Sequence, residues 1–154
     1  MPGNVFEDLA RWFSYSLKLQ DRFIKTPKMK GTVNRGDIYA CHLGQNIGYE
    51  KSRLEARPCV VVSTDNINHN SENIVVIPLS KNIKYVRTIK GKMKLRYDWH
   101  YVLYKAKYKL NYDSAVQCED IRCISKIRLG KYIDHVDPQD MKNISKRIKS
   151  ALQA

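Results

Sequence analysis

The chain lacks a long uncharged apolar run. No segment approaches the ~18 consecutive apolar residues of a membrane-spanning helix, and six charged residues interrupt the partly apolar stretch 5–24. The first residues also lack the basic start, apolar centre and small-residue cleavage site of a secretory signal. We therefore expect a protein that stays in the cytoplasm.

Paired metal-ligand motifs are missing as well. The four cysteines include no C-x-x-C pair, and the four histidines form no ligand motif with them, which argues against a structural zinc site. Free and mostly buried thiols are expected, because the cysteines lie in or at the ends of apolar runs. They are Cys41, Cys59, Cys118 and Cys123. Carboxylates are not clustered for a two-metal site, and no cofactor is predicted.

Acidic residues are scarce relative to basic ones. The 154 residues include 28 Lys and Arg but 15 Asp and Glu, a formal net charge of +13. Such a surplus favours polyanionic partners, nucleic acid first, although an acidic protein partner would fit equally. The surplus is densest in residues 81–110, which hold ten basic residues, several aromatics and one Asp. This mixture suits a single-stranded nucleic acid, and we predict an extended hairpin or loop here, although alternating aromatics also fit an ordinary strand.

Length and periodicity predict one domain with an added helix. The chain is long enough for one core and short for two. Residues 4–24 are typical of a helix capped by Asn4, with an apolar stripe to bury. Residues 25–34 are typical of a linker, so 1–33 is predicted to be an extension and 34–154 the main domain. The stripe consists of Phe6, Leu9, Phe13 and Leu17.

The main domain is predicted to be rich in short strands. The expected strands are 36–43, 58–63, 73–79, 99–106, 114–118, 120–124 and 132–136. A short helix should begin at Ser125, and a last helix should follow Asp137 and Pro138, which suit a cap and a first helical position. Its expected buried stripe is Met141, Ile144, Ile148 and Leu152. This pattern predicts a mostly β, α+β fold curled into a small barrel.

Two consecutive apolar strands carry an arginine and a hydroxyl at their ends. Arg57-Pro58 leads into a Cys-Val-Val-Val-Ser run, and an Ile-Val-Val-Ile-Pro-Leu run ends in Ser80. Neighbouring buried strands can bring such ends together, and the pair suits phosphate chemistry. The flanking segments are Arg35-Gly36-Asp37-Ile38-Tyr39 upstream, and Asp113-Ser114-Ala115-Val116 and Ile121-Arg122 downstream.

Taken in this order, these segments resemble the MazF/PemK family of toxin endoribonucleases, from about Arg35 to the C-terminus. The resemblance implies an SH3-like barrel, a homodimer and a neutralising antitoxin protein. It implies a sequence-specific, metal-independent endoribonuclease that cleaves single-stranded RNA. It also implies that Arg57 and Ser80 are the catalytic residues, with serine standing where the family has threonine.

Four further residues are candidates for RNA binding. Glu50 belongs to a Gly-Tyr-Glu segment similar to the family's RNA-covering loop, although an ordinary solvated loop is an equal alternative. Asp120 stands where the family often has glutamine before Ile-Arg, so the cleavage specificity of relatives should not be carried over. Arg35 matches the family's opening strand, and Lys81 opens the basic segment.

Two other functions remain open at this point. A toxin of the same fold can inhibit a protein target such as DNA gyrase without cutting RNA, but it has no use for an arginine beside a strand-end hydroxyl. The serine at position 80 keeps a non-catalytic nucleic-acid binder open. A lone His100 in the basic segment is a possible general base, although a structural role is the commoner one.

Overall fold

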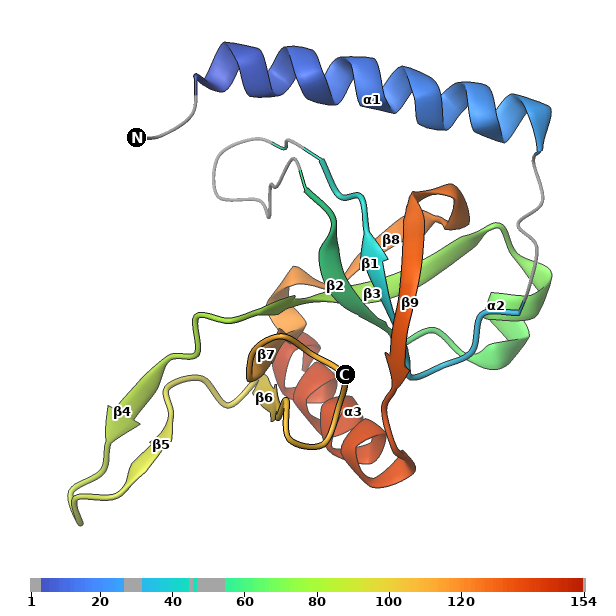
Figure 1. Ribbon diagram of the computed structural model, residues 1–154. Coiled ribbons are helices and arrows are strands. Elements are labelled where there is room, and N and C mark those ends of the chain that lie inside the picture. Colours follow the sequence, from blue (N-terminus) through green and yellow to red (C-terminus); the bar gives the residue numbers. More distant parts are fainter. Residues whose placement is uncertain (1–3, 27–31, 45, 47–54, 154) are drawn as a thin grey trace.

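The structure is a computed structural model that describes residues 4–26, 32–44, 46 and 55–153. It is rich in short antiparallel strands (Figure 1). In chain order the elements are α1 (Val5–Lys25), β1 (Asp37–Cys41), β2 (Arg57–Val61), α2 (Asp65–Asn70), β3 (Asn73–Ser80), β4 (Tyr85–Arg87), β5 (Met93–Leu95), β6 (His100–Leu103), β7 (Ser114–Gln117), the 3-10 turn η1 (Cys118–Asp120), β8 (Arg122–Ser125), the 3-10 turn η2 (Lys126–Arg128), β9 (Leu129–His135) and α3 (Pro138–Leu152). The predicted α+β class is confirmed.

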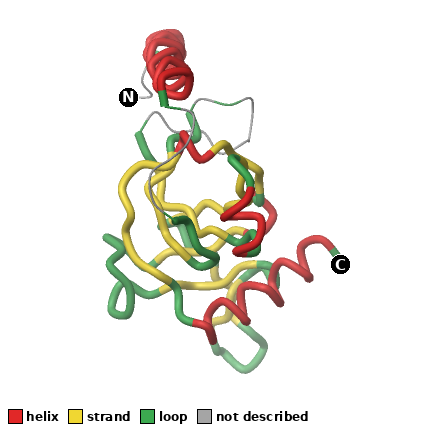
Figure 2. The backbone as a smooth tube through the Cα atoms, turned by 90° about the vertical axis from the view of Figure 1, so that its right-hand side faces the viewer, coloured by secondary structure: helices red, strands yellow, loops and turns green. Residues whose placement is uncertain are grey.

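Seven strands form one curled sheet in the order β6-β7-β3-β2-β1-β9, with β8 also pairing with β3. β3 is the longest of these strands: β2 lies on one side, and β8 and then β7 lie on the other. Figure 2 shows the strands curving around a common centre. The edge strands β6 and β9 are not hydrogen-bonded to each other, so the predicted barrel is open along this seam.

The central strands are buried on both faces. Alternate residues point to opposite sides of a strand, so Val60 and Ile77 pack in one core with Ile144 of α3. Cys59 and Val76 belong to a second core on the other face, with residues from β1, β8 and β9. This double burial explains why the strands appear in the sequence as continuous apolar runs.

The final helix begins as predicted. Asp137 caps α3 by accepting a hydrogen bond from the backbone N–H of Asp140 at 2.8 Å, and Pro138 is the first helical residue. Ile144 is fully buried, but the expected burial of Leu152 is wrong, because the C-terminal end of α3 projects away from the sheet (Figure 2). The helix α2 was not expected, since six residues give too short a periodic pattern.

The first half of the basic segment forms a hairpin outside the main sheet, whereas β6, in its second half, belongs to that sheet. β4 pairs only with β5, and Tyr85 lies opposite Leu95. Gly91 in the turn has φ +77°, which favours glycine. Figure 1 shows the hairpin extending from the end of β3. The expectation of an extended hairpin is therefore confirmed.

The N-terminal helix is confirmed, but the prediction of its buried face is wrong. Asn4 caps α1 by accepting the backbone N–H of Phe6 at 3.1 Å. The predicted stripe residues Phe6, Leu9, Phe13 and Leu17 are all exposed, whereas Leu19 is buried. Within the described residues no helix is long and apolar enough to cross a membrane. Three of the four free cysteines are buried, and Cys123 is exposed.

Polar and aromatic contacts, not the apolar stripe, dock α1. The Tyr15 hydroxyl lies 3.2 Å from Nε2 of His42, and the Arg22 guanidinium donates to the carbonyl of Ile127 at 2.7 Å. Trp12 lies against Gly44, where a Cβ would come within 2.1 Å of the indole ring. The helix therefore depends on a glycine at position 44.

Replacing Gly44 with alanine is expected to detach α1 while leaving the sheet folded, because the new methyl would overlap Trp12. Hydrogen exchange should accelerate at least tenfold in residues 5–25 and stay unchanged in β3. Gly91→Ala is the matched control: it has a similar positive φ, but no heavy atom lies within 4 Å of the added Cβ. Equal exchange in α1 of both variants would show that Trp12 does not hold the helix.

Candidate active site

Arg57 and Ser80 stand at the same end of two neighbouring antiparallel strands. β2 and β3 are antiparallel, with Cys59 opposite Pro78. Continuing this register by two residues sets Arg57, which begins β2, opposite Ser80, which ends β3. Directly opposite residues have Cβ atoms about 5 Å apart and point to the same face, and both residues are half-buried. The antiparallel register thus brings together the two strand ends selected from the sequence.

A local hydrogen bond orients the Ser80 hydroxyl. Its oxygen accepts the backbone N–H of Asn82 at 3.2 Å, a contact typical of serine at a turn. A hydroxyl can accept and donate at the same time. This bond restricts the side chain as the extra methyl of a threonine would, and the O–H is left to donate to a phosphate oxygen.

A second arginine emerges on the same face, one strand away. Arg122 lies opposite Val76 in the β3–β8 pair, and Val76 shares a face with Ser80 because the two residues are four positions apart on one strand. Two guanidinium groups on one face suit successive phosphates of a nucleic acid, since each offers a planar fork of donors. Sequence analysis did not select Arg122 as a site residue.

The thiols near this site are not nucleophiles. Burial raises the pKa of Cys59 well above its ordinary value and a hydrogen bond with Cys41 raises it further, whereas Arg57 and Arg122 act in the opposite direction. Burial raises the pKa of Cys118 to about 12. Both groups are therefore protonated at neutral pH, and the thiolate is the reactive form.

No metal ligands are assigned to this site. Among the residues that the structure describes, no three His, Cys, Asp or Glu side chains come together as a metal site would require. At the end of the β2–β3 pair where the candidate site lies, the polar side chains are those of Arg57 and Ser80.

Two of the predicted RNA-binding residues lie near the site. Lys81 directly follows Ser80 and is exposed, with its ammonium 5.1 Å from the centre of the Tyr112 ring. Asp120 is half-buried at the end of η1, which connects β7 to β8. Because both of these strands pair with β3, this turn lies level with the middle of β3.

The structure does not bring Arg35 to the site. Its guanidinium donates to the Ser145 hydroxyl at 2.8 Å, and its backbone N–H donates to Asp65 at 2.6 Å. The far end of β1, Cys41, is the residue opposite Arg57, and six extended residues span about 20 Å. Arg35 therefore makes a structural contact and is not part of the candidate site. Glu50 lies outside the described residues.

His100 occupies a buried position two strands away from β3. It is 2% exposed, and its Nε2 lies 2.7 Å from a carboxylate oxygen of Glu119. The contact between His100 and Glu119 connects β6 to η1. We therefore assign His100 a structural role and do not include it in the candidate site.

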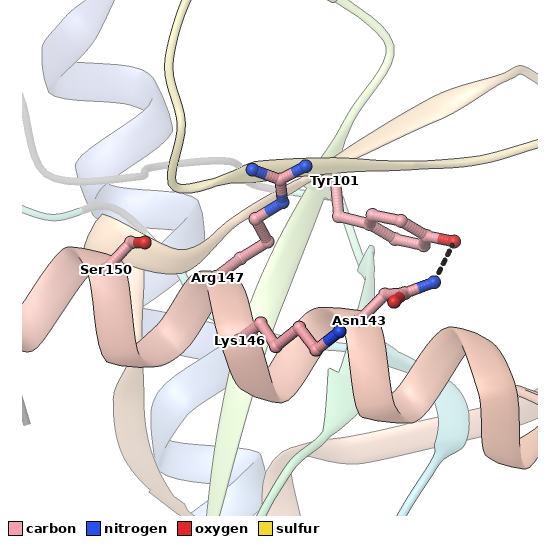
Figure 3. A pocket seen from close by; sticks show the side chains of 5 residues that line it. All are labelled: Tyr101, Asn143, Lys146, Arg147 and Ser150. Carbon is pink, nitrogen blue, oxygen red and sulfur yellow. Dashed lines mark hydrogen bonds between the residues drawn. The ribbon is translucent and has the colours of Figure 1, made fainter.

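A pocket of about 360 Å³ lies between β6 and α3. In Figure 3 the Tyr101 ring and the Asn143 side chain close one end, where the Asn143 amide donates to the Tyr101 hydroxyl at 3.2 Å. The Arg147 guanidinium donates to the carbonyl of Asp98 at 2.8 Å. Because α3 covers the face opposite to Cys59 and its neighbours, this pocket does not belong to the candidate site.

Comparison with known proteins gives a consistent result. Residues 34–152 match the model of the PemK-like, MazF-like toxins of type II toxin–antitoxin systems. Over 120 residues, which are 78% of this chain and 91% of the relative, the sequence is 28% identical to the endoribonuclease MazF of Staphylococcus saprophyticus. The helix α1 lies outside the matched residues.

Solved structures share the fold. MazF from Deinococcus radiodurans superposes with a TM-score of 0.59 at 15% identity, covering 81% of this chain and 100% of that chain. An endoribonuclease from a mycobacterial species, solved in complex with its cognate antitoxin, gives a TM-score of 0.56 at 22% identity, covering 81% of this chain and 96% of that chain.

Proposed function

Because the chain belongs to the PemK-like, MazF-like toxin family of type II toxin–antitoxin systems, we propose that it is a sequence-specific endoribonuclease of the cytoplasm. It cleaves single-stranded RNA without a metal ion, acts as a homodimer and is neutralised by an antitoxin protein. The observation that supports the proposal is the antiparallel pairing of β2 with β3, which places Arg57 at the start of β2 near Ser80 at the end of β3. A gyrase inhibitor needs no such pair, so the nuclease is the favoured function.

The proposed reaction is an internal transesterification. The 2′-oxygen of the ribose attacks the adjacent phosphorus, the bond from phosphorus to the 5′-oxygen of the next nucleotide breaks, and a 2′,3′-cyclic phosphate forms. The 2′-hydroxyl gives up its proton and the departing 5′-oxygen takes one up, so no water or cofactor is consumed. The extra charge develops on the non-bridging phosphate oxygens.

Each assigned residue has a role that its chemistry supports. Arg57 binds the non-bridging oxygens and neutralises the developing charge, because arginine stays protonated and is a poor base. Ser80 donates its hydroxyl hydrogen to a phosphate oxygen. Arg122 and Lys81 hold neighbouring phosphates. Glu50 is the candidate acceptor of the 2′-hydroxyl proton.

Mapping of cleaved ends tests this function. Pure protein incubated with long RNA in the presence of a chelator should cut at a small set of sequences and leave 2′,3′-cyclic phosphate and 5′-hydroxyl ends. Cleavage that stops with chelator and returns with Mg²⁺, or ends that carry a 5′-phosphate, would contradict the mechanism. Inhibition of supercoiling without any RNA cleavage would favour the gyrase alternative.

Ser80→Ala is expected to slow cleavage by roughly 10²-fold, because one preorganised donor to the transition state is lost. Ser80→Thr should cleave at least as fast as the wild type, since the hydroxyl is kept and β-branching restricts its rotamers. Single-turnover rates measure both, with thermal unfolding to show that the fold is intact. A wild-type rate for Ser80→Ala would remove the hydroxyl from the mechanism.

The β4–β5 hairpin is proposed to bind the RNA backbone. It leaves the sheet directly after Ser80, and all seven of its cationic side chains are exposed, with no acidic residue in 81–97. They are Lys81, Lys84, Arg87, Lys90, Lys92, Lys94 and Arg96. Cations without competing carboxylates suit phosphate contacts, which release counterions and make affinity depend on salt.

Changing Lys90, Lys92 and Lys94 together to alanine should weaken RNA binding and flatten its salt dependence. Each lost phosphate contact removes about 0.7 from the slope of log affinity against log salt for a single strand, so the slope should shrink by about 2. The substrate is an RNA with a 2′-deoxy residue at the cleavage site. The matched control changes the exposed Lys142, Lys146 and Lys149 of α3. An unchanged slope with lost antitoxin binding would assign the hairpin to the antitoxin.

A further inference from the structure

The helix α1 uses one of two apolar faces to contact the rest of the chain. Trp12 and Leu19 lie on the docked face. The other face carries five large apolar side chains that are 45–82% exposed: Phe6, Leu9, Phe13, Leu17 and Ile24. At 3.6 residues per turn this stripe lies roughly 120° around the helix from the docked face. Figures 1 and 2 show α1 along the outer edge of the molecule.

An exposed stripe of this size indicates an interface. Its five side chains present on the order of 600 Å² of surface. This area is at the upper end of the largest apolar patch found on a typical monomer, and such patches are often functional. Two such stripes packed together would bury about 1,200 Å², which reaches the range of specific interfaces. No described residue covers the stripe, as its exposure shows.

Four of the five stripe residues lie symmetrically about position 15, and the fifth, Leu9, would lie opposite Asp21. Phe6 and Ile24 lie nine residues on either side of it, and Phe13 and Leu17 lie two residues on either side. If two copies of α1 lie antiparallel, Phe6 of each therefore meets Ile24 of the other, and Phe13 meets Leu17. A two-fold contact requires one patch to complement itself in this way.

The charges beside the stripe favour the same arrangement. Asp21, Glu7 and Lys25 lie beside the stripe, roughly 70–110° around the helix from its centre. In an antiparallel two-fold pair the same edges meet, so Glu7 of each copy comes beside Lys25 of the other, and this pair occurs twice. Within one helix, Lys25 already pairs with Asp21 at 2.8 Å. A parallel pair would instead bring this edge against the docked side of the second helix.

We propose that two copies of this chain associate through their α1 helices, packed antiparallel along the stripe. The contact lies outside residues 34–152, the part that matches the toxin family. It does not depend on RNA cleavage, and it adds to any contact made by the toxin domain. The extension then holds two toxin domains together.

Glutamate in the middle of the stripe tests the association. Phe13→Glu with Leu17→Glu in the full chain should lower the mass measured by sedimentation, and the dissociation constant of the α1 contact should rise at least tenfold. Both positions are exposed, so the fold should remain intact, as circular dichroism and RNA cleavage would show. Ser14→Glu is the control, because it adds a carboxylate about 90° around the helix from the stripe centre and removes no apolar side chain. A mass equal to that of the wild type overturns the proposal.

Charge reversal tests the antiparallel orientation. Glu7→Lys and Lys25→Glu should each weaken self-association by a few-fold, as expected for exposed ion pairs. An equimolar mixture of the two variants restores both Glu–Lys contacts, so it should assemble like the wild type although Lys25→Glu still lacks its pair with Asp21. A mixture no stronger than either variant overturns the antiparallel contact. Unchanged mass together with lost antitoxin binding would assign the stripe to the antitoxin and overturn self-association.

Discussion

Arg57→Ala is expected to lower the rate of RNA cleavage by at least 10²–10³-fold, the usual loss when a preorganised charge stabiliser is removed from a transition state. Arg57 begins β2 at the end of the β2–β3 pair where Ser80 ends β3, and the assigned mechanism has no second cation placed directly at the reacting phosphate. Single-turnover cleavage of a short RNA containing one mapped site measures the effect. RNA affinity should fall much less, because the hairpin and Arg122 still hold neighbouring phosphates.

Two further variants distinguish a catalytic role of the Arg57 guanidinium from a general effect of positive charge. Arg57→Lys keeps the charge but loses the planar fork, so it should recover only part of the rate. Arg147→Ala removes a half-buried guanidinium from α3, on the other face of the sheet, and should cleave at the wild-type rate. If Arg57→Ala cuts RNA as fast as Arg147→Ala, the assignment of the site is wrong.

Removing a single substrate oxygen should have a larger effect still. An RNA that carries deoxyribose on the 5′ side of the mapped cleavage site has no 2′-oxygen to attack the phosphorus, so no product should appear at that position. The protein should bind this RNA with nearly unchanged affinity, because phosphate contacts supply most of the binding energy.

The same substitution one nucleotide downstream is the control. It leaves the attacking oxygen in place, so cleavage should continue there at a similar rate. Cutting at the deoxy position would mean that water or another external nucleophile attacks the phosphate, and the transesterification would have to be abandoned.

The central part of the fold was predictable because its determinants are local. Apolar runs bounded by turn residues predicted the central strands. Asp137 and Pro138 predicted the start of α3. Arg57 and Ser80 were predicted together because each terminates a run, and antiparallel pairing brings such ends together.

What was missed depends on contacts between distant segments. Periodicity showed that α1 is amphipathic, but the face it docks is decided by Trp12 against Gly44 and by Arg22 at η2. Arg35 is adjacent to the motif in sequence, yet β1 carries it about 20 Å from the site. Arg122 was passed over because its place beside β3 follows from a strand pairing that its own neighbours do not reveal.

The pairing of β1 with β9 makes the sheet around the candidate site depend on a segment that is synthesised late. β1 separates β2, which begins with Arg57, from β9, which ends at His135. A ribosome makes the chain from its N-terminus at about 5–20 residues per second, and pairings between distant segments form late. Until residues 129–135 have been made, β1 has an open edge and the strand that carries Arg57 lacks its support on that side. We therefore expect the sheet around Arg57 to be completed only after residues 129–135 have left the ribosome.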